Sequence, residues 1–395
     1  MIGNKIETKQ ETLSNFNHRA QETVKFIHAS DIHLGAAQYR NECRANDFIK
    51  AFQEILDLSI KFKVDFILLA GDVFTSLEML PGLMTKIVEI LQNFKKFTKG
   101  SILIIAIEGN HDIRRYSRGF KFNHRGQSWL KLLNSLGLIV LLDSEVDVAL
   151  EQMFKPFNFE IRKGGKIQIK NVVIYGTRYY GETPVSILSK IRKAIIKKKG
   201  VFNILLQHFG IEGQMKNVPG IKLEEIQHLR HRVDYLALGH FHKQYMLENW
   251  IYNPGSSEAV CSIDNSFNRG IFLVKISKNL ENLEKKVENL RLNNRKYIWE
   301  VINFKYEMRD KNEMENYIVK KLTYSLKDLN YDLDPSSSQI PILNLMLKGF
   351  KPLKPIRVHE KDLRNKICDI FPVIDIRVYQ KFMSPSKTLD NYIIT

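Results

Sequence analysis

The sequence predicts an α/β domain followed by a smaller α+β module. Short, continuously apolar runs such as VKFIHAS and VDFILLAG recur between Val24 and Lys275, and runs of this length suit strands that are covered on both faces. Helical patterns alternate with these runs, which is typical of a mostly parallel sheet. The chain has 395 residues, more than one hydrophobic core usually serves, so two domains are expected.

The elements follow in order along the chain. Residues 1–23 are polar and lack the apolar core of a signal peptide, so we expect a mobile N-terminal extension. The α/β domain covers 24–275, with helices in NDFIKAFQEILDLSIKF and LMTKIVEILQNFKKF, whose apolar residues recur at three and four. Its strands end just before a set of polar residues: Asp31, Asp72, Asn110, His208 and His240.

Residues 276–296 are expected to form a connector. The leucines of NLENLEKKVENLRLNN stand at helical spacing, but the stretch is too short for a coiled coil. The second domain, 297–385, then reads as the strand YIWEVINF, the helix KNEMENYIVKKLTYSL, the strand PILNLMLKG, the helix EKDLRNKICDIF and the strand VIDIRVYQ. This is a small α+β module of ordinary domain size. Residues 386–395 are expected to be a tail.

Composition narrows the class of protein. The formal net charge of +17 favours a polyanionic partner, of which nucleic acid is the commonest inside a cell. An acidic membrane surface or a lysine-rich thermophilic proteome would also account for the charge. The cysteines Cys43, Cys261 and Cys368 form no CxxC pair, and no apolar run approaches the ~20 residues of a membrane helix. These features predict a soluble, cytoplasmic protein without a disulfide framework.

The polar residues at the strand ends carry the chemistry. Ligand sites of such sheets collect beyond the carboxyl ends of the strands, so we expect these side chains to converge. Glycines before Asp72, Asn110 and His240 allow tight turns near a metal. A mixed set of oxygen and nitrogen ligands suits Mn²⁺, Fe or Zn²⁺. Seven ligands are too many for one tetrahedral ion, but they suit two ions roughly 3.5–4 Å apart. The expected ligands are Asp31, His33, Asp72, Asn110, His208, His240 and His242.

His111 follows the ligand Asn110 in the string GNHD, so we expect it to reach a scissile phosphate or leaving oxygen as an acid or stabiliser. Each string alone is a common coincidence. The ordered set DxH, GD, GNHD, QH and GHxH, each at the end of an apolar run, is what predicts a centre. The histidines outside these strings are interpreted as surface or structural residues: His124, His228, His231 and His359.

These strings resemble the calcineurin-like metallophosphoesterase superfamily, and more closely the DNA double-strand-break repair nucleases of the SbcD or "Mre-eleven" family. The segments FIHASDIHLG, LLAGDVF, AIEGNHDIRR, LGHFHKQY and YNPGSSEAV carry the resemblance over 24–275, and only topology and position carry it over the capping region. It implies a helix-flanked β-sandwich, a capping, DNA-binding domain, and a manganese-dependent exonuclease or endonuclease that uses two metals.

Residue roles follow from the same resemblance. It implies one Mn²⁺ held by Asp31, His33, Asp72 and His242, and a second held by Asp72, Asn110, His208 and His240, with Asp72 bridging. His111 takes the position of the family's catalytic histidine. Thr75 stands where many members carry a further histidine, so the balance of exonuclease and endonuclease activity stays open.

The resemblance also implies a homodimer and an SMC-like ATPase partner of the SbcC type. Helices near 80–97 and 127–137 are candidates for the dimer contact, whereas no obvious amphipathic helix pair follows the last strand for ATPase docking.

A basic, aromatic loop after GNHD is interpreted either as a phosphate and base contact or as a solvated loop. It contains Arg114, Arg115, Tyr116, Arg118, Phe120, Lys121, Phe122 and Arg125.

A second basic cluster, expected on a helix as a solvated face, contains Lys190, Arg192, Lys193, Lys197, Lys198 and Lys199.

Two other functions remain beside the DNA nuclease. One is a phosphodiesterase or phosphatase for small nucleotides or phosphoproteins, and the other is a non-catalytic DNA-tethering subunit. The net charge of +17 and the extra domain favour the nuclease.

Overall fold

The computed structural model describes residues 23–113, 128–181, 185–279, 282–306, 308, 310–329, 337, 339–350 and 360–382. These residues form two compact units. The first unit holds the described residues of Met1–Gly35, Phe52–Ser257 and Phe267–Leu292, and the second holds those of Ala36–Ala51, Glu258–Ser266 and Asn293–Thr395. Residues 1–22 of the expected extension (1–23) and the whole expected tail (386–395) lie outside the described residues.

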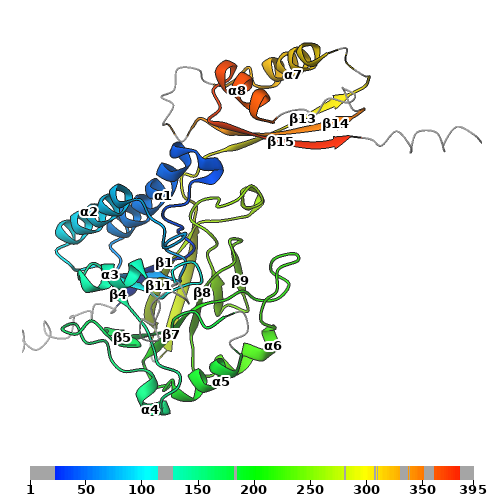
Figure 1. The fold of residues 1–395 in the computed structure, drawn as a ribbon. Helices are drawn as coiled ribbons and strands as arrows, with labels where there is room; N and C mark the ends of the chain where they lie inside the picture. Colours follow the sequence, from blue (N-terminus) through cyan, green and yellow to red (C-terminus); the bar gives the residue numbers. More distant parts are fainter. Residues whose placement is uncertain are drawn as a thin grey trace, which may run out of the picture. The chain divides into compact units, whose positions relative to one another are not determined.

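The first unit contains two six-stranded sheets (Figure 1). In the first sheet the order is β12-β11-β1-β2-β3-β4. Its parallel strands are β1 (Val24–Ala29), β2 (Phe66–Leu69), β3 (Leu103–Ala106) and β4 (Val140–Leu141). Two antiparallel strands extend it, β11 (Ile271–Asn279) and β12 (Asn282–Leu290).

The second sheet has the order β5-β6-β7-β8-β10-β9. Its parallel strands are β6 (Val172–Gly176), β7 (Phe202–His208), β8 (Tyr235–Gly239) and β10 (Ile251–Asn253). At its two edges β5 (Lys166–Ile169) and β9 (Tyr245–Leu247) run antiparallel to their neighbours.

One core joins the inner faces of the two sheets. Phe26 and Phe66, opposite each other in register, stack with ring centroids 4.9 Å apart, and the ring of Tyr235 from the second sheet meets Phe26 edge-on. Alternate residues of β6, β7 and β8 complete this buried cluster. The first unit is therefore the expected β-sandwich.

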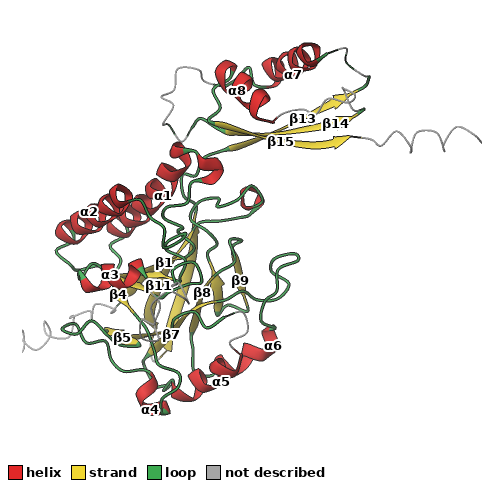
Figure 2. Cartoon of the chain, in the orientation of Figure 1, coloured by secondary structure: helices red, strands yellow, loops and turns green. Residues whose placement is uncertain are grey.

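Helices flank the sandwich (Figure 2). Helix α1 (Glu42–Lys61) follows β1, and α2 (Pro81–Phe97) follows β2; both match the helical patterns of the sequence. A hydrogen bond from the Leu130 N–H to the Ser128 side chain caps α3 (Trp129–Ser135). The outer face of the second sheet packs against α4 (Leu150–Met153), α5 (Val185–Ala194) and α6 (Leu223–Ile226).

The expectation of a connector over 276–296 is wrong. Strand β12 pairs with β11 in a nine-residue antiparallel register, from Asn279 opposite Asn282 to Ile271 opposite Leu290. Leu283 and Val287 pack against the sandwich core, and the Lys285 ammonium lies 6.0 Å from the centre of the Tyr252 ring. The leucine spacing was misleading because pairing with the preceding strand and packing on the sandwich core outweigh local helical preference.

The second unit contains the three-stranded sheet β13-β14-β15, whose strands are all parallel. Strand β13 (Tyr297–Phe304), helix α7 (Lys311–Ser325), strand β14 (Ile342–Gly349), helix α8 (Glu360–Ile370) and strand β15 (Asp375–Phe382) alternate along the chain. Figure 1 shows both helices on one face of this sheet, where they share a buried cluster with the strands. The smaller domain of the sequence analysis thus has the expected five elements.

A buried charge network ties three chain segments of this unit together. Arg295 donates to both carboxylate oxygens of Asp47, at 2.6 and 2.8 Å. Arg44 donates to Asp47 at 2.6 Å and to Glu258 at 3.3 Å. The remaining Arg295 nitrogen donates to the backbone oxygens of Ser337 and Ile340. Each of these charged groups has an oppositely charged partner and further hydrogen bonds, which buried ions require.

Among the described residues, no helix has both the length and the apolar character needed to cross a membrane.

We predict that Asp47→Ala destabilises the second unit, because two buried guanidinium groups lose their shared carboxylate. Breaking a buried pair from one side costs about 3–5 kcal/mol of unfolding free energy. Native-state hydrogen exchange of the β14 amides measures this loss. The control Asp362→Ala removes the half-exposed partner of Lys311 and should leave exchange unchanged; equal exchange in both variants would contradict the prediction.

Candidate metal centre

The predicted polar residues meet at one edge of the sandwich, where the parallel strands of both sheets end. Asp31 follows β1, Asp72 follows β2 and Asn110 follows β3. His208 is the last residue of β7, and His240 follows β8. Because this edge receives the carboxyl ends of five strands, side chains far apart in the sequence become neighbours.

The structure brings all seven expected ligand residues together. Asp31, His33 and His242 form one group and Asp72, His208 and His240 another, each with one donor atom per residue within 4.8 Å of the others. Asn110 joins the second group, since its Oδ1 lies 3.1 Å from His208 Nε2 and 3.0 Å from His240 Nδ1. The backbone N–H of His240 donates to the Asp31 carboxylate, which connects the two groups.

The turns that carry these ligands are backbone-strained. Asp31, His33 and Asp72 have φ of 50°, 51° and 50°, and His240 has φ of 93°. Left-handed conformations cost a non-glycine residue about 1–3 kcal/mol and persist where the surroundings impose them. Four such residues in one cluster indicate that the fold holds these side chains in place at the cost of unfavourable backbone conformations.

Two glycines allow the turns to approach one another. A Cβ on Gly109 would lie 2.2 Å from Asp72 Oδ1. A Cβ on Gly239 would lie 2.2 Å from the Ala70 carbonyl oxygen. Both contacts are far closer than carbon and oxygen tolerate, so glycine at these positions is a requirement of the packing.

The electrostatics centre on Asp72. Burial alone would raise the pKa of Asp72, but His208, 3.2 Å away, outweighs burial and holds that pKa well below its usual range. Burial by itself would lower the pKa of His208, yet the charge of the Asp72 carboxylate raises this pKa to about 9. Burial lowers the pKa of His33 to about 3 and that of His240 to about 4, and it raises the pKa of Asp31.

The arrangement fits a cation. His33 Nε2 and His242 Nε2 face each other at 3.2 Å, and His33 Nδ1 is buried without a hydrogen-bond partner among the described residues. Imidazoles, carboxylates and an amide oxygen form the donor set that manganese, iron or zinc prefers. The site therefore offers ligand atoms for a cation, and hydrogen bonds within the protein do not satisfy all of these buried polar atoms.

His111 lies at the exposed rim of this centre. Its backbone N–H donates to Asp72 Oδ1 at 2.8 Å, and its Nδ1 lies 2.9 Å from the Thr75 carbonyl oxygen. Its ring centre is 4.9 Å from that of His33. With Nδ1 held by Thr75, Nε2 is the nitrogen that remains to exchange a proton.

Asp112 has a role that the sequence analysis did not assign, although it belongs to the string GNHD. Its carboxylate accepts the backbone N–H groups of Gly109, Val73 and Phe74, at 2.9, 3.2 and 2.8 Å. Burial and the nearby Asp72 raise the pKa of Asp112 to about 7, although the N–H groups oppose this shift. Asp112 thus clamps the turn after β2 to the turn after β3.

Tyr179 is a second residue that the sequence analysis missed. Its ring centre lies 5.9 Å from that of His208 and 6.2 Å from that of His240. It also lines a cavity of about 120 Å³ beside His240, together with Phe209 and Pro219. No sequence signal marks Tyr179, because its position depends on the path of the chain after β6.

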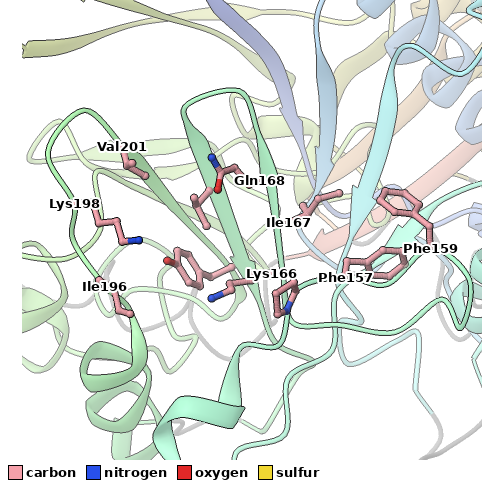
Figure 3. Close-up of a pocket in the computed structure, with 11 residues that line it drawn as sticks. Phe157, Phe159, Lys166, Ile167, Gln168, Ile196, Lys198 and Val201 are labelled. Carbon is pink, nitrogen blue, oxygen red and sulfur yellow. The ribbon is translucent and has the colours of Figure 1, made fainter.

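A cavity of about 310 Å³ lies away from the centre (Figure 3). Phe157, Ile167 and Tyr175 contribute to its walls, and Lys166 and Lys198 extend toward each other across it. Val201 also lines it and precedes β7, whose far end carries His208. The cavity and the metal centre therefore lie at opposite ends of this strand.

The remaining expected residues lie elsewhere. His228 is half-buried, His231 is exposed, and neither belongs to a described metal group. His124, His359 and the basic loop after GNHD lie outside the described residues. Of the second basic cluster, Lys197, Lys198 and Lys199 follow α5, which ends at Ala194, so only the first three of its residues are helical. Lys197 forms an ion pair with Asp234.

Comparison with known proteins gives the following matches. A sequence model described as calcineurin-like phosphoesterase matches residues 24–244. Archaeal proteins named DNA double-strand break repair protein Mre11 are similar to this chain. That of Saccharolobus solfataricus is 26% identical over 381 residues, 93% of this chain and 84% of that protein. That of Archaeoglobus fulgidus is 30% identical over 242 residues, 60% of this chain and 50% of that protein.

We predict that Asp112→Asn weakens divalent-cation binding about 10- to 100-fold, the usual effect of losing a partner that orients ligands. An asparagine amide keeps a single acceptor oxygen, and its NH₂ group repels the backbone N–H that the other carboxylate oxygen accepts, so the clamp between the two turns is weakened. Calorimetric titration with Mn²⁺ measures the affinity. Asp57→Asn, an exposed position on α1, is the matched control, and equal affinities in the two variants would refute the clamp.

Proposed function

This chain belongs to the calcineurin-like phosphoesterase family and within it to the Mre11/SbcD-type nucleases, and from this we propose that it hydrolyses phosphodiester bonds of DNA with two divalent cations, Mn²⁺ foremost. The observation that carries the proposal is the meeting of seven oxygen and nitrogen ligand residues in two groups. The relatives named DNA double-strand break repair proteins support a role of this reaction in such repair.

In this proposal Asp31, His33 and His242 hold one ion, while Asn110, His208 and His240 hold the other. Asp72 would be the carboxylate shared by the two ions, as the family resemblance implies, and its two oxygens contact different neighbours, His208 and the His111 N–H. When bound, such ions activate a water molecule and neutralise charge on a phosphoryl oxygen. The protein orients the ligands through strained turns that the sandwich holds in place.

We assign proton transfer to His111. Its ring is exposed at the rim of the centre, as contact with an external substrate requires. The Thr75 carbonyl accepts Nδ1–H, so the imidazolium form of the ring gives its Nε2 proton to the leaving oxygen and remains as the neutral Nδ1–H imidazole. Thr75 takes part through its backbone, so threonine in place of a further histidine leaves this contact intact.

DNA is preferred over a small nucleotide for two reasons. The net charge of +17 creates a field that concentrates long polyanions. The relatives that match 93% and 60% of the chain are named DNA repair proteins. The homodimer and the SMC-like ATPase partner stay predictions of the sequence resemblance.

We predict that the full chain degrades labelled linear duplex DNA in Mn²⁺ and not in EDTA, and that His111→Leu slows cleavage about 10²- to 10⁴-fold, the usual contribution of an acid–base residue. Gel analysis of the products measures the rate. His231→Leu, at an exposed histidine away from the centre, should cleave like the wild type.

A cyclic nucleotide tested in parallel discriminates between the enzyme classes. Cleavage of the cyclic nucleotide alone would replace the nuclease by a small-molecule phosphodiesterase. DNA binding without cleavage of either substrate would favour a tethering subunit. Normal cleavage by His111→Leu would remove His111 from the mechanism.

We predict about two Mn²⁺ per chain, falling to about one in His242→Ala, because His242 belongs to only one of the two ligand groups. Metal content after gel filtration measures the stoichiometry. Lys243→Ala, whose ammonium contacts the Gln214 carbonyl instead, should retain both ions. One ion in the wild type would contradict a centre of two cations.

A further inference from the structure

The cavity of about 310 Å³ lies on the outer face of the second sheet, at the edge formed by β5 and β6 (Figure 3). Lys166 stands opposite Tyr175, and Gln168 stands opposite Val173, so these four side chains share one face of the sheet. Val173 and Tyr175 belong to the buried cluster of that outer face. We call this the lysine cavity and define it by six of its lining residues: Phe157, Lys166, Val173, Tyr175, Lys198 and Val201.

Hydrogen bonds hold the backbone on both sides of the lysine cavity. Before β5, the Phe157 N–H donates to the Lys166 carbonyl oxygen at 2.7 Å, which fixes this segment beside the strand. After α5, the Val201 N–H donates to the Lys198 carbonyl oxygen at 3.2 Å. Both lysines therefore stand on hydrogen-bonded backbone, and a ligand meets a cavity that is already formed.

The lining of the lysine cavity is largely apolar. Val173 and Tyr175 are buried and contribute the strand side, and Phe157 contributes a ring from the segment before β5. Two further lining residues, Phe159 and Ile196, remain 53% and 57% exposed. Exposed apolar side chains beside a formed cavity are surface that an apolar ligand can cover.

Two positive charges lie beside this apolar lining. Figure 3 shows the Lys166 and Lys198 side chains extended toward each other across the cavity. Neither ammonium group forms an ion pair with a described residue, and none of the described residues that line the cavity is acidic. Lys197, next to Lys198, is by contrast paired with Asp234. Two ammonium groups without a carboxylate attract an anion into the cavity.

From these features we propose that the lysine cavity binds a small organic anion, with a carboxylate or phosphate group on a flat or branched apolar body. The anionic group contacts the ammonium groups of Lys166 and Lys198. The apolar body packs on Phe157, Tyr175 and Val201. Cavities of about 300–1,000 Å³ with apolar walls and a few converging polar groups take ligands of metabolite size. The site goes beyond the proposed function, since phosphodiester hydrolysis does not require it.

Two larger partners fit this cavity less well. A DNA duplex is far wider than a cavity of about 310 Å³, and Lys166 and Lys198 extend across the cavity instead of outward. A stable protein partner covers about 800 Å² of surface, whereas the apolar side chains here surround one hollow. The lysine cavity also lies at the opposite end of β7 from His208, away from the proposed reaction.

The test titrates the full chain in EDTA with 2-naphthoate, a flat apolar carboxylate, by isothermal titration calorimetry. We expect binding at a single site. The alcohol 2-naphthalenemethanol has the same rings without the charge and should bind about 10-fold more weakly, the usual effect of losing a hydrogen bond between charged groups. Inorganic phosphate, a charge without rings, should not displace 2-naphthoate. A parallel titration with 2-naphthyl phosphate shows which of the two anionic groups the site prefers.

The double variant Lys166→Met/Lys198→Met removes both charges and keeps side chains of similar length. It should weaken 2-naphthoate binding about 10-fold or more, and it should bind 2-naphthalenemethanol no more weakly than the wild type does. The matched control is Lys163→Met/Lys193→Met, at two exposed lysines that do not line the cavity. This control should bind both ligands like the wild type.

Equal 2-naphthoate affinity in Lys166→Met/Lys198→Met and the wild type would overturn the inference, as would equal affinity of the wild type for 2-naphthoate and the alcohol. An equal loss of both ligands in the double variant would also contradict it. Displacement of 2-naphthoate by a blunt duplex hairpin would make the cavity part of a DNA surface and refute the small ligand. Because EDTA removes divalent cations, the outcome is independent of the proposed nuclease activity.

Discussion

The Asp72 carboxylate is the group on which the candidate metal centre depends, because its two oxygens face different neighbours. One accepts the His111 N–H, and the other lies 3.2 Å from His208. This placement requires a left-handed turn at Asp72 and a glycine at position 109. It also requires Asp112, which binds the turns after β2 and β3 to each other. An anion so placed makes a cation at this edge electrostatically favourable.

The strain at this edge is sustained by the rest of the sandwich. Four ligand residues hold left-handed conformations, which a short peptide would relax at once. The strands that lead into these turns are buried on both faces, and one core joins both sheets. A displaced turn would move a strand and open that core. Close packing thus gives the ligands the rigidity that metal sites need.

The second unit depends on paired charges in its interior. In its interior, Arg44 and Arg295 are paired with Asp47 and Glu258, so each buried charge is satisfied by a partner from a different segment. The charges of this network thus hold together segments that are far apart in the sequence.

The sequence by itself determined what depends on short-range patterns. Apolar runs and helical spacing marked α1, α2, α7 and α8, and the ordered strings at strand ends identified all seven residues that converge. Only the tertiary structure decided what depends on contacts between distant segments. The packing of β12 on the sandwich core, the Asp112 clamp, the place of Tyr179 and the Asp47 network are of this kind. A residue's neighbours along the chain predict its local conformation, but its partners across the fold exist only once loops have closed and strands have paired.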